Sequence, residues 1–190
     1  MERMAERTME VTKITGWNED SGVFLEAEKC MAEAFPPEEQ VPVRKLLRYS
    51  LCAGTPGSLD LWGLDGRFAG FSYWQRLPGK RNRKYIAFLA VDKRMRGKGA
   101  GSRILQLLTA EDSAAEWLLG VERPLASAPN RAERIRRLGF YLRNGWRDTG
   151  MHAVDGGVDY ELLSLSEETS ADAPRAIVTD FWDRLTMFTG

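Results

Sequence analysis

The chain has 190 residues, and its 27 Lys and Arg residues balance its 27 Asp and Glu residues, so the formal net charge is zero. This length suits one α/β domain, and the balanced charge lacks the basic excess of a nucleic-acid-binding scaffold. No apolar run is long enough to cross a bilayer, and the start "MERMAERTMEV" lacks the apolar stretch of a signal peptide. We therefore expect a cytoplasmic protein whose partners are neither nucleic acid nor membrane.

The first segments are predicted to be a strand and two helices. Residues 9–15 form the strand, and residues 23–35 form a helix because apolar residues recur there at helical spacing. Pro36 and Pro37 end that helix, and a second helix covers residues 41–54. Both helices precede the main strands of the chain.

A hairpin and a basic loop follow. Residues 58–75 hold two alternating apolar runs on either side of Asp65-Gly66, which is the strongest short hairpin signal. Residues 79–84, "GKRNRK", are predicted to be a basic loop. The hairpin predicts an antiparallel pair before the central segment.

The central segment joins a buried strand to a helix through a glycine-rich turn. The apolar run from Tyr85 to Val91 leads into a basic stretch with Gly97, Gly99 and Gly101 at alternate positions, and a helical pattern follows. Glycine lets a backbone approach an anion without a Cβ in the way, and the first turn of a helix offers unpaired N–H donors. The basic side chains around the turn are Lys93, Arg94, Arg96 and Lys98. The segment therefore predicts a polyphosphate site.

The second half is predicted to hold a strand at 116–122, a helix at 131–144 capped by Asn130, and a hairpin of 146–154 with 158–165. After Leu165 the composition becomes that of a linker, followed by an amphipathic helix with Ile177, Phe181, Leu185 and Phe188 on one face. We therefore expect one domain over residues 9–165 and a linker with a C-terminal helix over residues 166–190. The apolar face of that helix could dock on the domain or on a second copy, forming a homodimer.

Two common phosphate-binding patterns do not fit the turn. The P-loop pattern is absent. In the dinucleotide pattern G-x-G-x-x-G, the third glycine would be Ser102 or Ile104.

The pattern that is present, Arg96-x-x-Gly99-x-Gly101 directly after "FLAVDKRM", closely resembles the acyl-coenzyme A loop of the GNAT acetyltransferases. A second family mark is present in Phe140-Tyr141 followed by Gly145-Trp146, where Trp replaces the usual Phe. "FPPEEQVP" and the ending "DTGMHAVDGGVDYELL" resemble one bacterial branch of the family. The resemblance spans Met9 to Leu165.

This resemblance implies a mixed α/β fold with a mostly antiparallel central sheet and helices on both faces. It implies that the fourth and fifth strands are parallel, are joined by the helix after the glycine turn, and part where the coenzyme sits. The implied reaction is transfer of acetyl from acetyl-CoA to a primary amine of a small molecule or peptide, by direct attack in a ternary complex. The co-substrate is acetyl-CoA, and no metal is implied.

The resemblance also implies which residues act. Tyr141 would be the general acid on the departing sulfur, since a phenol titrates near pH 10 and is protonated at neutral pH. Glu122 is the first candidate for the base, through a water. The coenzyme-binding residues would be Leu89, Ala90, Val91, Arg96, Gly97, Lys98, Gly99, Ala100, Gly101, Ser102 and Asn130.

Several alternatives stay open at this point. Tyr85, Glu38, Glu39 or ordered water could serve as the base, and the acidic first helices would suit a cationic acceptor. Glu122 could instead be a strand end paired with an arginine, and Tyr141 could be a packed helix-end aromatic. The fold could also carry a non-catalytic coenzyme A sensor or a dinucleotide-dependent enzyme. Cys30 and Cys52 are expected to be buried core residues.

Overall fold

The computed structural model describes residues 10–51, 57–77, 82–155 and 157–167, together with Thr169, Ala173 and Ile177, and leaves out the side chains of Glu38 and Asp155. Within this part, the elements in chain order are β1 Val11–Lys13, α1 Gly22–Ala34, the 3-10 helix η1 Pro37–Glu39, α2 Val43–Leu51, β2 Gly57–Leu64, β3 Arg67–Arg76, β4 Arg83–Val91, the 3-10 helix η2 Lys93–Met95, α3 Ala100–Ala110, β5 Glu116–Glu122, α4 Arg131–Arg143, β6 Arg147–Asp155 and β7 Val158–Ser164.

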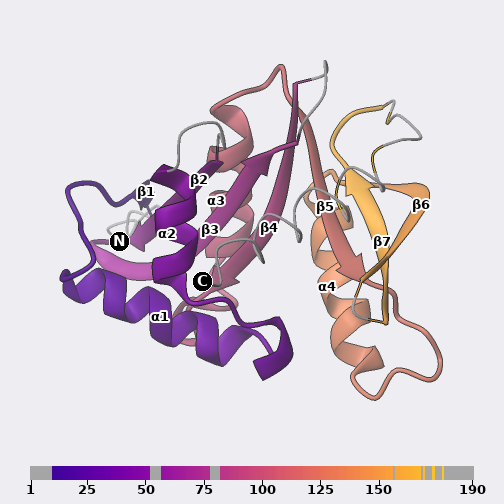
Figure 1. Cartoon of the computed structure of the whole chain (residues 1–190), viewed down its shortest axis with the longest axis horizontal. Coiled ribbons are helices and arrows are strands. Elements are labelled where there is room, and N and C mark those ends of the chain that lie inside the picture. Colours follow the sequence, from indigo (N-terminus) through magenta and orange to yellow (C-terminus); the bar gives the residue numbers. More distant parts are fainter. Residues whose placement is uncertain are drawn as a thin grey trace, which may run out of the picture.

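The strands form one sheet in the order β1-β2-β3-β4-β5-β7-β6, in which only the β4–β5 pair is parallel among the described strands. Helices α1 and α2 cover one face of the sheet, and α3 and α4 lie against the other (Figure 1). Each face has its own buried apolar cluster. The first includes Phe24, Met31, Leu46 and Phe71, and the second includes Ile104, Leu108, Trp117 and Trp146. The predicted mixed α/β fold with a parallel fourth and fifth strand is confirmed.

The predicted β2–β3 hairpin is confirmed, and its turn is Asp65-Gly66 with φ of 50° and 76°. Positive φ at both central residues is typical of the type I′ turn, whose twist matches that of the flanking strands.

The predicted basic loop at 79–84 is wrong at its end, because Arg83 and Lys84 begin β4. Both side chains form ion pairs with nearby carboxylates. Arg83 Nε lies 3.1 Å from Glu116 Oε2, and Lys84 Nζ lies 2.9 Å from Asp112 Oδ2. The ammonium of Lys84 also lies 4.3 Å from the ring centre of Trp74, a distance at which a cation and an aromatic face attract.

These contacts lie at the start of the parallel β4–β5 pair. The pairing covers only the first part of β4. Strands β4 and β5 are in register only from Arg83–Glu116 to Ile86–Leu119. On its other edge β4 pairs with β3 as far as Val91, with a bulge where Trp74 faces Ile86 and Tyr73 faces Phe88. The extra residue in this bulge is Ala87. The second half of β4 is therefore paired on one edge only, and its ribbon diverges from that of β5 in Figure 1.

Two further predictions concern side chains of the helical layer and the C-terminal segment. Cys30 is buried in the α1 layer, as expected, and burial raises the pKa of its thiol to about 12. Cys52 lies outside the described residues.

Ala173 and Ile177 are buried against the α1 face of the sheet. Phe181, Leu185 and Phe188 lie outside the described residues, so the homodimer stays a prediction.

None of the helices in the described part of the chain has the length and apolar character needed to cross a membrane.

Candidate functional site

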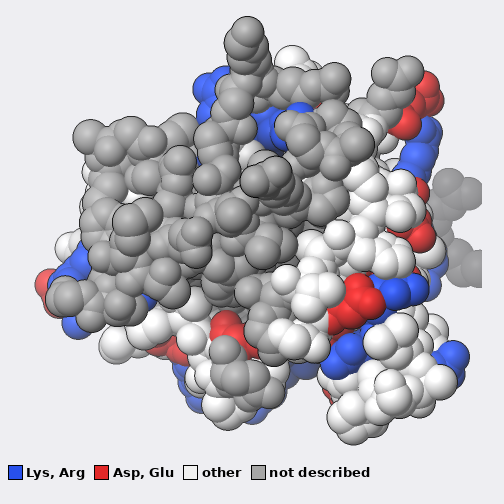
Figure 2. Space-filling view, turned by 45° about the vertical axis from the view of Figure 1, so that its right-hand side comes forward, with Lys and Arg blue, Asp and Glu red and all other residues white. Residues whose placement is uncertain are grey.

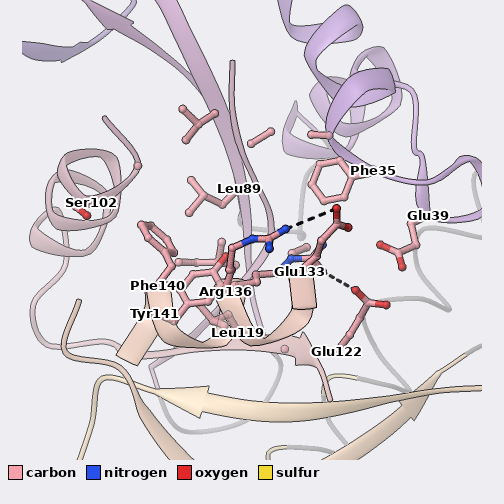
Figure 3. Close-up of a pocket in the computed structure, with 18 of the residues that line it drawn as sticks. Phe35, Glu39, Leu89, Ser102, Leu119, Glu122, Glu133, Arg136, Phe140 and Tyr141 are labelled. Atoms are coloured by element: carbon pink, nitrogen blue, oxygen red, sulfur yellow. Dashed lines mark hydrogen bonds and ion pairs between the residues drawn. The ribbon is translucent and has the colours of Figure 1, made fainter. Parts of the chain in front are cut away.

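A cavity of about 750 Å³ lies where β4 and β5 part. Its walls come from the end of α1, η1, the second half of β4, the glycine turn, β5, α4 and β7 (Figure 3). The cavity therefore extends from the face of the sheet that α1 covers to the glycine turn and α4.

At one end of the cavity, the glycine turn presents bare backbone. Gly97 and Gly99 have φ of 74° and 77°, and a Cβ built on either would meet no atom within 4 Å. Helix α3 begins at the next residue, and its first helical hydrogen bond runs from the Arg103 N–H to the Gly99 carbonyl at 3.1 Å. The N–H groups of the first turn before Arg103 have no carbonyl partner within the helix. This arrangement can hold an anionic group such as phosphate.

The third glycine of the turn, Gly101, has a different role. A Cβ at this position would lie 3.2 Å from Cζ of Phe140 and 3.3 Å from Cγ2 of Val91. Gly101 therefore lets α3 pack closely on α4 and on the end of β4. The sequence pattern treats the three glycines alike, whereas the structure assigns two of them to an open cradle and one to packing.

The edge of β4 that faces β5 forms a second wall. Leu89, Ala90 and Val91 line the cavity and pair with β3 but not with β5. Arg96 donates from Nε to the carbonyl of Val91 at 3.1 Å, so this carbonyl already has one partner. The wall offers backbone donors and acceptors to an extended polar ligand.

Tyr141 lines the cavity from α4. The residue is 9% exposed, and its ring makes edge contacts with Phe140 and Trp146, at centroid distances of 5.1 and 6.1 Å. Figure 3 shows Phe140 and Tyr141 projecting from α4 toward Leu89. Burial raises the pKa of Tyr141 to about 12, although the charge of Arg137 acts in the opposite direction. The phenol is therefore protonated throughout the neutral range.

Glu122 stands at the end of β5 and is held by two arginines of α4. Its Oε1 lies 2.7 Å from Nη2 of Arg134, and its Oε2 lies 2.6 Å from Nη1 of Arg137. The side chain is 7% exposed, so each carboxylate oxygen is matched to a guanidinium in a largely dry setting. A carboxylate bound in this way is costly to separate from its partners.

The other end of the cavity lies on the face of the sheet that α1 covers. The strand register places Tyr85, Gly120, Tyr160 and Leu162 on this one face. A Cβ at Gly120 would lie 3.0 Å from the hydroxyl oxygen of Tyr85 and 3.7 Å from Cβ of Tyr160. Gly120 therefore lets the two tyrosines approach β5 closely.

Among the predicted coenzyme-binding residues, all line this cavity except Lys98 and Asn130. Lys98 borders a smaller surface cavity with Arg67 and Arg94. Asn130 occupies the N-cap position of α4 but makes no capping hydrogen bond, so its predicted capping role is wrong. Its Oδ1 instead accepts from Nε of Arg134 at 2.7 Å, and the stronger charge-assisted partner explains the difference.

Both predicted catalytic residues and some of the alternatives also line the cavity. Tyr141 and Glu122 lie on it, as do Tyr85 and Glu39, whereas the side chain of Glu38 is outside the described part. Other residues line the cavity without having been predicted, among them Phe35, Gly120, Tyr160 and Leu162. Gly120 carried a usable signal, because glycine inside a strand marks a close approach.

The cavity wall carries charges of both signs. Its arginines are Arg96 in the glycine turn and Arg136 and Arg137 on α4, and its carboxylates are Glu33 on α1, Glu39 on η1, Glu122 on β5 and Glu133 on α4. Over the described part of the surface in Figure 2, acidic and basic side chains lie next to one another. On α4 the charges are paired, because Glu122 contacts Arg137 and Glu133 lies 3.8 Å from Arg136. Arg96 is the arginine that the glycine turn adds to the cavity wall.

Comparisons with known proteins agree with this geometry. The model of the Acetyltransferase (GNAT) family matches residues 24–146. A solved Bacteroides thetaiotaomicron protein assigned to the GNAT family shares 20% identity, with TM-score 0.62 and 94% of each chain covered. An Elizabethkingia anophelis GNAT acetyltransferase with acetyl-CoA bound shares 15% identity, with TM-score 0.54 and coverage of 85% of this chain and 99% of the other.

The Escherichia coli ribosomal-protein-S18-alanine N-acetyltransferase shares 16% identity, with TM-score 0.53 and coverage of 86% of this chain and 97% of the other. At these identities the likeness concerns the fold. Among curated proteins, none matches the sequence.

Proposed function

The chain belongs to the acetyltransferase (GNAT) family, and from this membership we propose that it transfers acetyl from acetyl-CoA to a primary amine of a small molecule or peptide. The observation that carries this proposal is a single cavity in which the bare glycine turn, the unpaired edge of β4 and the buried hydroxyl-bearing ring of Tyr141 meet. The glycine turn and the edge of β4 suit the binding of a long phosphate-bearing thioester. The hydroxyl of Tyr141 suits protonation of the thiolate that leaves.

The residues present fit acetyl-CoA as co-substrate. Gly97 and Gly99 leave open space where a Cβ would stand, as a backbone cradle for a pyrophosphate requires. Arg96 adds charge at that end. The edge of β4 from Leu89 to Val91 can bond the amide groups of the extended arm. The co-substrate brings the activated acyl thioester, and the protein brings position and charge.

The transfer makes three physical demands, and the cavity offers a group for each. The thioester oxygen gains charge and needs a donor, for which we propose the backbone N–H groups on the unpaired edge of β4. The departing thiolate needs a proton, for which we propose Tyr141. The amine must lose a proton before it attacks, and here ordered water in the cavity is our first proposal.

Glu122 was the first candidate for the base, and that role stays a prediction. Both of its oxygens are engaged by guanidinium groups, which favours the other interpretation, a strand end paired with arginines. In that case Glu122 positions Arg137 on the cavity wall and does not itself accept the proton.

Replacing Glu122 by Gln tests the two roles. We expect kcat to change by about threefold or less and the KM for acetyl-CoA to rise, because the amide cannot hold both Arg134 and Arg137 in place. Loss of a general base would instead lower kcat by about a hundredfold or more. Steady-state kinetics with each substrate varied in turn separates these results, and Glu39→Gln gives the comparison for the alternative acidic side chain.

The proposed function is tested by calorimetric titration with acetyl-CoA, with NAD as the comparison, followed by an amine panel in which thiol release is measured. Saturable binding of acetyl-CoA alone, with thiol release that depends on an amine, is the expected result. Binding without release for any amine would support the non-catalytic sensor, and binding of NAD alone would support the dinucleotide enzyme.

A further inference from the structure

We propose that the acceptor is a primary amine with one positive charge and an apolar body, and that Ile177, beyond the last strand, is a residue that selects for it. This inference rests on the proposed function and names the substrate class for the acceptor end of the same cavity.

The acceptor end is the part of the cavity on the face of the sheet that α1 covers, and apolar side chains form a continuous part of its wall. Phe35, at the end of α1, lines it and makes an edge contact with Phe88 at a centroid distance of 5.3 Å. Leu162 on β7 is 2% exposed, and Tyr160 presents its ring close to Gly120. A buried apolar wall favours an acceptor whose carbon skeleton leaves water on binding.

Ile177 contributes to this wall from outside the part of the chain that the family model covers, which ends at residue 146. Its side chain is 3% exposed and lines the cavity. It belongs to the same buried cluster as Met31, Tyr85 and Leu162, and this cluster lies on the α1 face of the sheet. The wall that Ile177 supplies is therefore at the acceptor end and not at the glycine turn.

Ala173 provides an internal comparison. Ala173 is fully buried in the same cluster but does not line the cavity. A change at Ala173 therefore perturbs the docking of this segment without altering the cavity wall directly.

The charges at the acceptor end favour a singly charged amine over a polyamine. Glu33 is paired with Lys93 at 2.9 Å, and Glu122 is paired with two arginines. These carboxylates are already compensated, so they do not form the set that a polycation would need. An acceptor with a single ammonium group makes no such demand, and its apolar body can occupy the cavity.

Two sources share this chemistry, namely a free arylalkyl or branched alkyl amine and a peptide that begins with an apolar residue. The test uses phenylethylamine, ethanolamine, 1,4-diaminobutane, and two tripeptide amides that begin with Phe or with Ser. Thiol release gives kcat/KM for each, and calorimetry gives the Kd of phenylethylamine in the presence of coenzyme A. A higher kcat/KM for phenylethylamine indicates a free amine as the acceptor, and a higher kcat/KM for the Phe-initial peptide indicates a peptide.

We expect phenylethylamine or the Phe-initial peptide to exceed its polar counterpart. Ile177→Ala should lower kcat/KM for the apolar acceptor and weaken its calorimetric affinity by about tenfold each, with little change for ethanolamine or for acetyl-CoA affinity. Ala173→Gly should leave the preference among acceptors unchanged.

Three results would overturn the inference: preference for 1,4-diaminobutane, no advantage of either apolar acceptor over its polar counterpart, or an Ile177→Ala variant with the wild-type preference among acceptors. Failure of the proposed function would look different, because thiol release would then be absent with every amine, whether or not acetyl-CoA binds.

Discussion

Tyr141→Phe is expected to lower kcat by about a hundredfold or more, the usual effect of losing a general acid. The ring should keep its contacts with Phe140 and Trp146, because only the hydroxyl is removed. The affinity for acetyl-CoA by calorimetry should therefore stay within about twofold of wild type, since the hydroxyl acts on the departing group. Tyr49→Phe, at a buried position that does not line the cavity, controls for loss of a phenol hydroxyl.

The raised pKa of Tyr141 also sets the shape of the pH profile. With a pKa of about 12 in the fold and near 10 in the unfolded chain, the phenol keeps its proton across the working range. Stability linked to this group is complete below about pH 10 and is lost as pH rises toward about 12. We expect kcat to show no decline between about pH 7 and pH 10 from loss of this proton. A near wild-type kcat in the Tyr141→Phe variant would show that Tyr141 only packs in the core and is not the general acid.

Gly99→Ala is the second change with a large expected effect. Gly99 has φ of 77° and lines the cavity at the start of α3. An alanine there adds left-handed strain of about 1–2 kcal/mol and places a methyl group in the cradle. The strain lowers stability, whereas the methyl group blocks a backbone contact with the phosphate, so we expect acetyl-CoA affinity to fall by about tenfold or more. Calorimetric titration measures the change.

Gly16→Ala is the matched control for this experiment. Gly16 has φ of 71°, and a Cβ there would also meet no atom within 4 Å, but Gly16 does not line the cavity. Both variants should lose similar thermal stability, and only Gly99→Ala should lose affinity. Equal affinity in the two variants would show that the glycine turn is an ordinary strand-to-helix connection.

The sequence predicted those features that depend on local signals. The Asp65-Gly66 turn, the bounds 116–122 of β5 and the glycine turn before α3 were all predicted correctly, because turn chemistry and periodicity are written in neighbouring residues. The resemblance to a known family then supplied Tyr141, which lines the cavity.

The remaining features depend on how distant elements meet. Tyr85 and Tyr160 are brought to one face by strand register, which a single sequence does not reveal. The pairing of Glu122 with two arginines depends on the packing of α4. Lys98 was expected at the coenzyme because it lies within the turn, but its side chain lies on the other side of that turn.

The locked start of the β4–β5 pair has a consequence for the thermodynamics of binding. The Arg83–Glu116 ion pair and the contacts of Lys84 hold the two strands together at one end. Their pairing ends at Ile86–Leu119, next to the bulge at Ala87. The separation is therefore a property of the folded chain itself, and no backbone hydrogen bonds between strands must break before a ligand enters. Such preorganisation removes a conformational cost from association, so strand order and register should be the same before and after binding.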